Sequence, residues 1–311
     1  MSMSVAMIGL GGIAHKAYLP VLSAWREIEL LLCSRNPTSV ADTQAQYRIQ
    51  RGTTNLEELL DWCPQVAFVL TPSTNHREII ERLLLAGIDV FAEKPLTLTL
   101  DETHYLAELA DRQGRVVMVG FNRRFAPLHR QARQLWGDRP IQMAVLQKNR
   151  SSAYHPNLYQ NYIDDTIHII DLLRFFCGDG IATYTSCQMG NEKLIGAAST
   201  VVYDHGGYGL VLTSLQAGRW FEQYALHGGS TSLYVDAFSR LTLVTEEEHK
   251  VWEEKYPSAW MNTLKARGFV DEISHFFECV QARSQPHTSA WEAYKTQLLL
   301  EGMVKAAKEP K

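Results

Sequence analysis

Residues 1–120 alternate short apolar runs with longer stretches in which apolar positions recur every three or four residues. Continuous apolar runs between helices are typical of strands in a parallel sheet that is covered on both faces, and the three-to-four spacing predicts amphipathic helices. The predicted strands are 5–8, 29–33, 66–70, 89–92 and 115–119, and the predicted helices include 75–86 and 100–112. This order predicts a βαβ array, and therefore an α/β domain.

After about Gly120 the pattern changes to strand-like segments separated by turn signals such as Asp204-His205-Gly206-Gly207. Little helix intervenes, which favours an antiparallel sheet. The predicted strands are 141–148, 183–189, 199–203, 208–215, 223–227 and 232–235, and helices are predicted at 165–177, 268–283 and 290–307. We therefore predict two domains, an α/β domain over residues 1–121 and an α+β domain over residues 122–311.

Composition and charge narrow the class of protein. The 311 residues include 46% apolar and 21% charged residues, the mixture of a soluble globular chain. Lys and Arg number 30 against 34 Asp and Glu, a formal charge of −4, so we expect no nucleic-acid partner. We expect no signal peptide and no membrane partner, because the start lacks a basic segment and the apolar runs are short. Five scattered cysteines without a C-x-x-C pair favour a reducing cytoplasm and argue against a metal site.

The first predicted strand is followed by Gly9-Leu10-Gly11-Gly12-Ile13-Ala14, which matches G-x-G-x-x-G/A at the start of a helix. Gly9 permits the tight turn, Gly11 lets a pyrophosphate approach the backbone, and Ala14 allows the helix to pack closely on the strand. The helix N-terminus then offers free N–H groups to the pyrophosphate. This context predicts a dinucleotide site.

The end of the second strand reads Cys33-Ser34-Arg35-Asn36. An acidic residue there would bind the 2′-hydroxyl of NAD, whereas the Arg35 guanidinium and the Ser34 hydroxyl suit a 2′-phosphate. The alternative is an ordinary surface arginine at a strand end. We favour NADP over NAD as the cofactor.

Two groups of residues have the chemistry of a catalytic site. Lys94, in Glu93-Lys94-Pro95, follows a buried strand, at the sheet edge where α/β proteins bind ligands. It could instead be a solvated loop lysine paired with Glu93. Asp164, His168 and Asp171 fall at i, i+4 and i+7, so on a helix they form one polar stripe suited to proton transfer. The alternatives are that Asp164 caps the helix and that His168 is a core histidine.

In this order the motifs resemble those of the Gfo/Idh/MocA family of nicotinamide-dependent oxidoreductases, over essentially the whole chain. The resemblance includes the glycine loop, Thr71-Pro72 with His76, the Glu93-Lys94-Pro95 motif, the sequence GFNRRF at 120–125 and the D-x-x-x-H pair Asp164 and His168. The sequence at 122–127 is similar to that of the MviM/YceM-like branch of the family.

The resemblance implies a Rossmann domain followed by a domain with a large open antiparallel sheet, often used for homodimer or homotetramer contacts. It implies that Lys94 contacts substrate and cofactor, that His168 is the acid/base, that Asp164 positions the substrate, and that the Lys94-Pro95 peptide is cis. Around the cofactor it implies contacts from Thr71, Pro72, Asn75, His76, Glu93, Lys94 and Asn122, which join the glycine loop, Ser34 and Arg35 as the predicted cofactor site.

The chain departs from the family where a glycine-rich stretch is common, since it reads Tyr159-Gln160-Asn161-Tyr162-Ile163, and Thr166 stands where a small residue is usual. Substrate identity therefore does not follow from the resemblance. We expect a hydride-transferring oxidoreductase that prefers NADP and acts on a small polyhydroxylated substrate. The rival hypotheses are a non-catalytic dinucleotide sensor and an enzyme that keeps its cofactor bound for epimerisation or elimination. Five aromatic residues could line a pocket, fill the core or form a subunit contact: Trp220, Phe221, Tyr224, Trp252 and Trp260.

Overall fold

The computed structural model describes residues 2–253 and 263–307, which lie in two compact units. The first unit comprises Met1–Phe121 and Phe269–Tyr294, and the second comprises Asn122–Gly268 and Lys295–Lys311. The predicted second domain, residues 122–311, differs from the observed unit because Phe269–Tyr294 returns to the first. Trp260 was one of the aromatic residues expected to line a pocket, fill the core or form a subunit contact. It lies outside the described residues.

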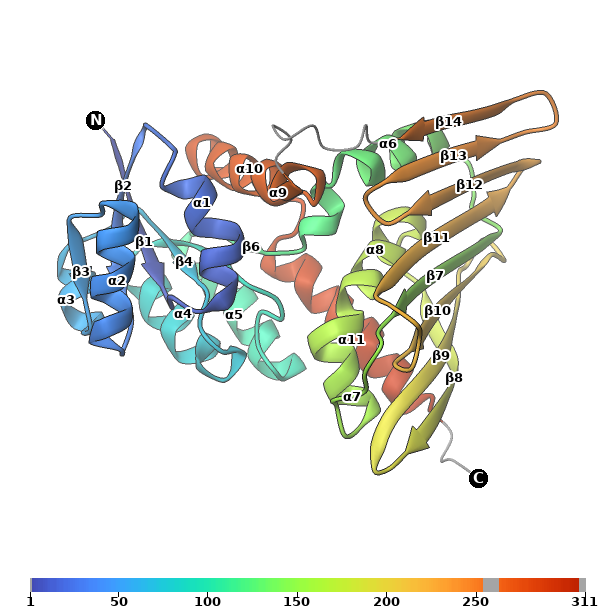
Figure 1. The fold of residues 1–311 in the computed structure, drawn as a ribbon, viewed down its shortest axis with the longest axis horizontal. Coiled ribbons are helices and arrows are strands. Elements are labelled where there is room, and N and C mark those ends of the chain that lie inside the picture. Colours follow the sequence, from blue (N-terminus) through green and yellow to red (C-terminus); the bar gives the residue numbers. More distant parts are fainter. Residues whose placement is uncertain (1, 254–262, 308–311) are drawn as a thin grey trace. The chain divides into compact units, whose positions relative to one another are not determined.

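In the described part of the first unit, a six-stranded parallel sheet has the order β3-β2-β1-β4-β5-β6, which confirms the predicted α/β array (Figure 1). The order reverses between β1 and β4, and such a point opens a crevice at the carboxyl ends of the strands. The strands are β1 (Met3–Ile8), β2 (Ile28–Cys33), β3 (Arg51–Thr53), β4 (Val66–Val69), β5 (Asp89–Ala92) and β6 (Val117–Val119).

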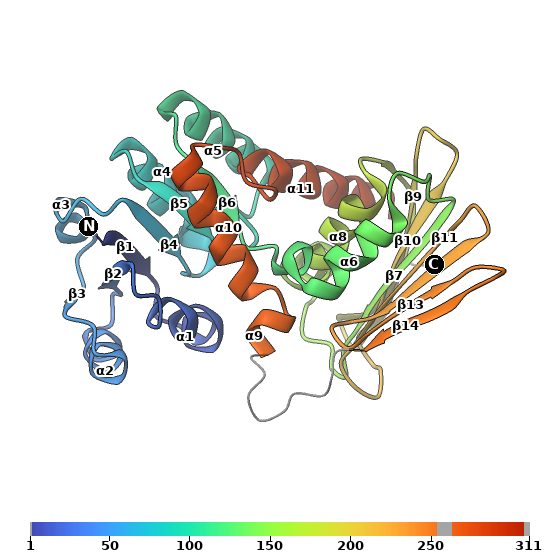
Figure 2. The same cartoon turned by 90° about the horizontal axis from the view of Figure 1, so that it is seen from above.

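The helices of this unit follow the strands in the alternating order of the predicted pattern. They are η1 (Ala14–Tyr18), α1 (Leu19–Leu22), α2 (Pro37–Tyr47), α3 (Leu56–Asp61), η2 (Ser73–Asn75), α4 (His76–Leu85), α5 (Leu100–Gln113) and α10 (Phe269–Ala282). Helix α10, shown in Figure 2, returns to this unit because Phe276 packs edge-on against Phe68 of β4 and Phe91 of β5, with ring centroids 5.5 and 5.6 Å apart. Burial of these aromatic rings explains why a distant segment joins the first unit.

The second unit has an eight-stranded sheet of order β14-β13-β12-β11-β7-β10-β9-β8. Neighbouring strands are antiparallel except β7 and β10, which pair in parallel, so the predicted antiparallel sheet is confirmed apart from this one pair. The strands are β7 (Met143–Asn149), β8 (Ile181–Gly190), β9 (Lys193–Val202), β10 (Tyr208–Ser214), β11 (Phe221–Gly228), β12 (Thr231–Asp236), β13 (Arg240–Val244) and β14 (His249–Glu253).

Helices lie along one face of this sheet, as Figure 1 shows, and the opposite face carries half-exposed side chains that alternate with buried ones along β10, β11 and β13. The remaining helices are η3 (Asn122–Phe125), α6 (Pro127–Trp136), α7 (Leu158–Asn161), η4 (Tyr162–Thr166), α8 (Ile167–Cys177), α9 (Thr263–Ala266) and α11 (Ala290–Lys305). Of the aromatic residues with an open assignment, Tyr224 is fully buried in the core. Within the ranges described, no helix combines the length and the apolar character needed to cross a membrane.

Candidate functional site

The glycine loop follows β1 and packs closely against the backbone that follows β4. Gly9 has φ +95°, and a Cβ there would lie 2.7 Å from the backbone nitrogen of Thr71, so a side chain would meet rigid backbone. A Cβ at Gly11 or Gly12 would meet nothing within 4 Å, so the backbone at these two positions faces open space. The loop therefore leaves room for a group that approaches the main chain, as a pyrophosphate does.

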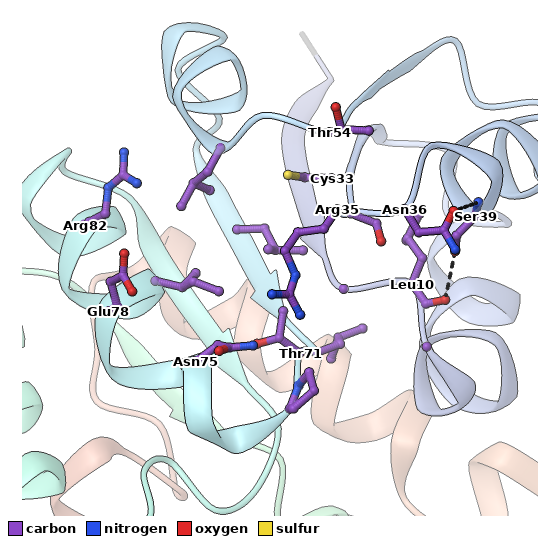
Figure 3. Close-up of a pocket in the computed structure, with 18 residues that line it drawn as sticks. Leu10, Cys33, Arg35, Asn36, Ser39, Thr54, Thr71, Asn75, Glu78 and Arg82 are labelled. Atoms are coloured by element: carbon purple, nitrogen blue, oxygen red, sulfur yellow. Dashed lines mark hydrogen bonds between the residues drawn. The ribbon is translucent and has the colours of Figure 1, made fainter.

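A pocket of about 520 Å³ lies beside this loop, at the carboxyl ends of β1, β2 and β4 (Figure 3). Its wall combines the open glycine backbone with apolar side chains such as Leu56 and Ile79, the combination that a pyrophosphate and a purine ring require. The lining residues are Ile8, Gly9, Leu10, Gly11, Cys33, Ser34, Arg35, Asn36, Ser39, Thr54, Leu56, Leu70, Thr71, Pro72, Asn75, Glu78, Ile79 and Arg82.

The side of the pocket formed by the end of β2 carries no carboxylate. Figure 3 shows the Arg35 side chain extending into the pocket, and no other residue in the described ranges forms a hydrogen bond or ion pair with its guanidinium. Asn36 begins α2, where its Oδ1 accepts hydrogen bonds from Thr38 N at 3.0 Å and Ser39 N at 3.3 Å. This part of the site is therefore positively charged and rigid at its base.

Most of the predicted cofactor residues of the first unit line this pocket, but not all of them. Gly12 and Ile13 continue into the helix, and Ala14 is fully buried. The buried His76 ring is absent from the lining, because its nitrogens lie 2.9 Å from the Thr71 carbonyl oxygen and 3.0 Å from that of Pro95. His76 thus holds two loops in place, and its predicted contact with a cofactor stays a prediction.

Several lining residues were missed by the sequence reasoning. The Asn36-Pro37 pair is a typical helix start and could have identified Asn36, because that helix begins where the second strand ends. No local pattern singles out the others, since Ser39, Thr54, Glu78 and Arg82 reach the pocket from three separate segments.

The turn after β5 holds Lys94 at the carboxyl edge of the same sheet. The buried Glu93 carboxyl accepts hydrogen bonds from the Tyr18 hydroxyl at 2.6 Å and from the Lys94 backbone nitrogen at 3.0 Å. Burial raises the pKa of Glu93. The implied cis Lys94-Pro95 peptide is confirmed. The Lys94 charge lowers the pKa of Glu93 against the effect of burial, so the two residues interact as the alternative supposed, although Glu93 is buried and the pair is not fully solvated.

In the second unit, Asp164 and His168 lie on one continuous helical run, α7-η4-α8. The run begins at Leu158 with Asn157 as its cap, so the alternative that Asp164 caps the helix is wrong. Asp164 lies in the π-helical segment η4, a feature that is frequent at functional sites. Its carboxylate is 54% exposed and lies 3.1 Å from His155 Nε2, a neighbour that no local sequence pattern indicated.

Asp171, the third member of the predicted polar stripe, has a different position. Its fully buried carboxylate accepts two hydrogen bonds from the Arg124 guanidinium, at 2.7 and 2.8 Å, and one from the Thr296 hydroxyl at 3.0 Å. Asp171 is therefore a structural anchor of α8, and the stripe reduces to Asp164 and His168. Asn122, the predicted cofactor contact of this unit, is buried and donates from Nδ2 to the Arg267 carbonyl oxygen at 2.8 Å.

A buried network of charges supports η4 from the sheet. Arg123 pairs with Glu222 through Nε at 2.8 Å, and the Lys148 ammonium contacts Asp165 Oδ1 at 2.8 Å. Arg150 also pairs with Asp165. Burial lowers the pKa of Lys148 to about 8. Burial opposes ionisation of Glu222, but Arg123 and Lys148 hold its pKa at about 2.

Comparison with known proteins agrees with this geometry. Residues 3–121 match the oxidoreductase family with an NAD-binding Rossmann fold. The chain is 28% identical to the oxidoreductase YceM of Salmonella typhimurium over 97% of both chains. It is 25% identical to D-apiose dehydrogenase of Paraburkholderia graminis, over 98% of this chain and 87% of that protein. A solved structure of the dehydrogenase MviM from Clostridium difficile superimposes with a TM-score of 0.89 at 25% identity, covering 98% of this chain and all of that one.

The doubly wound sheet, the glycine loop and the pocket beside it define a two-domain oxidoreductase that binds a nicotinamide dinucleotide. Its second unit has the large, mostly antiparallel sheet that the sequence resemblance implied. The first unit matches the Gfo/Idh/MocA oxidoreductase model, and the whole chain is similar to oxidoreductases of this type.

Proposed function

We propose that this protein is an NADP-preferring enzyme that transfers hydride between the nicotinamide and a small polyhydroxylated substrate of the sugar or polyol type. The observation that carries the cofactor preference is the Arg35 guanidinium, which has no hydrogen-bond or ion-pair partner among the described residues and lies in a pocket whose β2 end bears no carboxylate. The 2′-phosphate of NADP would supply a negatively charged partner for the Arg35 guanidinium. The substrate class is supported by the sugar that the D-apiose relative is named for. We expect the enzyme to use the nicotinamide pool of the cytoplasm.

The chain's own residues supply proton transfer and positioning, while the bound dinucleotide supplies the hydride acceptor. In the oxidative direction His168 takes the proton of the reacting hydroxyl, and Lys94 stabilises the negative charge that develops on that oxygen. Asp164 binds a substrate hydroxyl, and the His155 ring 3.1 Å away holds its carboxylate in place. The same residues act in reverse order for reduction.

The cofactor preference is tested by replacing Arg35 with alanine. We expect NADPH to bind about 10- to 150-fold more weakly, the equivalent of about 1.5–3 kcal/mol for a hydrogen bond to a charged group, and NADH binding to be unchanged. The measurement is a fluorescence titration of the purified protein with each dinucleotide. Arg26→Ala, a change of an exposed arginine outside the pocket lining, is the matched control.

Either of two results would contradict the proposal. Equal affinity of the wild type for NADPH and NADH, unaffected by Arg35→Ala, would remove the NADP preference. Failure to bind either dinucleotide would overturn the hydride-transfer function itself. The protein would then have the fold without a working cofactor site.

We further propose that two copies of the chain associate through the open face of the second sheet. Four half-exposed residues form a row across this face on adjacent strands, because Tyr234 pairs with Ala225, Ala225 with Val145 and Val145 with Leu210. An apolar row on the open face of a sheet can pair with the same row of a second copy, as a two-fold interface requires.

Replacing Tyr234 with glutamate tests this association, because a charge at position 234, the exposed residue at one end of the row, opposes burial against a second copy. We expect light scattering to show a dimer or tetramer for the wild type and a shift towards monomer for the variant. Leu85→Glu, at an apolar side chain of α4 that is 59% exposed, should leave the oligomer unchanged. A monomeric wild type, or equal effects of the two changes, would contradict the proposed interface.

A further inference from the structure

The second unit contains an arginine held against two aromatic rings. The Arg267 guanidinium carbon lies 5.5 Å from the centre of the Trp220 ring and 5.2 Å from that of Phe238. The two rings are nearly parallel, with an interplanar angle of 11° and centroids 6.4 Å apart. Stacking on aromatic faces leaves the N–H groups at the edge of the guanidinium available to another partner.

The backbone fixes Arg267 at this place. Its carbonyl oxygen accepts a hydrogen bond from Asn122 Nδ2 at 2.8 Å. The next residue, Gly268, has φ +89°, and a Cβ there would lie 2.1 Å from the Asn122 carbonyl oxygen, so the main chain is closely packed. Arg267 is therefore positioned by the fold.

A second arginine of the same unit shows what a purely structural stacked arginine looks like. Arg139 lies 5.3 Å from the centre of the Trp136 ring, and its Nε and Nη2 donate to the carbonyl oxygens of Trp136 and Leu135 at 2.8 and 2.6 Å. By contrast, the Arg267 side chain donates no hydrogen bond to any residue within 2–253 and 263–307 and forms no ion pair there. The fold has stacked Arg267 without using its donors.

The charge around Arg267 favours an anion. Arg123 lies over the same Phe238 ring, at 5.8 Å, and burial together with Arg123 lowers the pKa of Arg267. Among described residues, the network joined to Arg123 has three cations (Arg123, Lys148 and Arg150) and two carboxylates (Asp165 and Glu222), an excess of one positive charge. Arg267 raises that excess to two, in a chain whose formal charge is −4. Arg267 itself is an exposed residue, so its N–H groups are accessible to an anion, and this local excess of positive charge attracts one.

We propose that Arg267, stacked on Trp220 and Phe238, is a subsite for an anionic group of the substrate, a carboxylate or a phosphate. The guanidinium fork matches two oxygens of either group, and the aromatic rings keep its plane fixed. The inference rests on the proposed function and makes it more specific: the polyhydroxylated substrate is a sugar acid or a sugar phosphate, and neutral polyols are poorer ligands.

The test compares three sugars that differ at one carbon: D-glucose, D-glucuronate and D-glucose 6-phosphate. Binding to the full chain, with and without NADPH, is measured by ligand-observed NMR, which detects weak binding. We expect at least one anionic sugar to bind about tenfold or more tightly than glucose, and the better of the two identifies a carboxylate or a phosphate as the preferred group. Arg267→Gln should remove this preference, and Arg267→Lys should retain part of it.

Arg51→Gln is the matched control, because Arg51 is an exposed arginine of the first unit that lies 5.8 Å from the Trp62 ring. It should leave the anion preference unchanged. Absence of anionic-sugar binding, equal binding of all three sugars, or a preference that survives Arg267→Gln would each overturn the subsite. NADPH affinity should be the same in wild type and Arg267→Gln, so loss of the subsite is distinguishable from failure of the proposed function, which the dinucleotide titration reports.

Discussion

Replacing Lys94 with alanine is expected to lower turnover at least about a hundredfold, the scale of removing a group that stabilises developing negative charge, with NADPH affinity changed only a few-fold. NADPH affinity should change little because Lys94 lies in the turn after β5, outside the lining of the pocket beside the glycine loop. The two effects are measured separately, by steady-state turnover on a carbonyl or alcohol substrate found by screening and by NADPH titration.

The control for this variant is Lys193→Ala, a change of an exposed lysine at the start of β9. Both proteins should unfold at the wild-type temperature. Turnover that survives intact in Lys94→Ala would show that Lys94 has no catalytic role. A parallel loss of turnover and NADPH affinity would instead assign Lys94 to holding the cofactor.

The largest effect on stability is expected for Glu222→Ala. Glu222 is fully buried, accepts hydrogen bonds from Arg123 and Tyr224, and lies 3.8 Å from the Lys148 ammonium. Its removal leaves two buried cations without this partner, and breaking such a pair costs about 3–5 kcal/mol. The free energy of unfolding of the second unit, from urea denaturation followed by fluorescence, should fall by that amount. NADPH binding by the first unit should persist, because the units have separate cores.

Two comparisons make this prediction specific. Glu253→Ala, which removes a 65% exposed partner of Arg240 on β14, should cost less than about 1 kcal/mol. Because the pKa of Glu222 is about 2 when folded, below that of an unfolded glutamate, its ion pair is complete above about pH 5 and is lost only as the pH falls towards 2. The carboxylate of Glu222 is therefore fully ionised at both pH 5 and pH 7. Because Glu222 raises the pKa of Lys148, its removal lowers that pKa further, and the deficit of Glu222→Ala should be at least as large at pH 5 as at pH 7. If Glu222→Ala lowered the free energy of unfolding by less than about 1 kcal/mol, Glu222 would not be the partner that stabilises the buried Arg123 and Lys148.

The first unit was readable from the sequence because its strands are continuous apolar runs and its glycine loop has a fixed place after the first of them. The exceptions have local causes. Strand β3 is only three residues long, Arg51–Thr53. Strand β14 reads His-Lys-Val-Trp-Glu and buries none of these residues, so it lacks the apolar alternation that reveals a strand. The parallel pairing of β7 with β10 joins strands far apart in the chain, and no local pattern encodes it.

The second unit shows where local patterns stop being informative about a site. Asp164, Asp165 and Asp171 look alike in sequence, yet Asp164 is exposed beside His155, Asp165 is buried with Lys148, and Asp171 is buried with Arg124. Asp171 lies in α8, after the π-helical segment Tyr162–Thr166, and leaves the expected stripe because its carboxylate is buried against Arg124.

The sequence alone determined the parallel sheet and the glycine loop after its first strand, because these depend on the periodicity of apolar residues and on short motifs read within about ten positions. The residues for hydride transfer stay a prediction. Only the tertiary structure decided which charges are buried, that His76 holds loops while Arg35 faces the pocket, and that Arg267 stacks on rings from two other segments. The physical reason is that burial and electrostatic partners are set by residues distant along the chain, and their effect on a carboxylate or a guanidinium depends on distance in space.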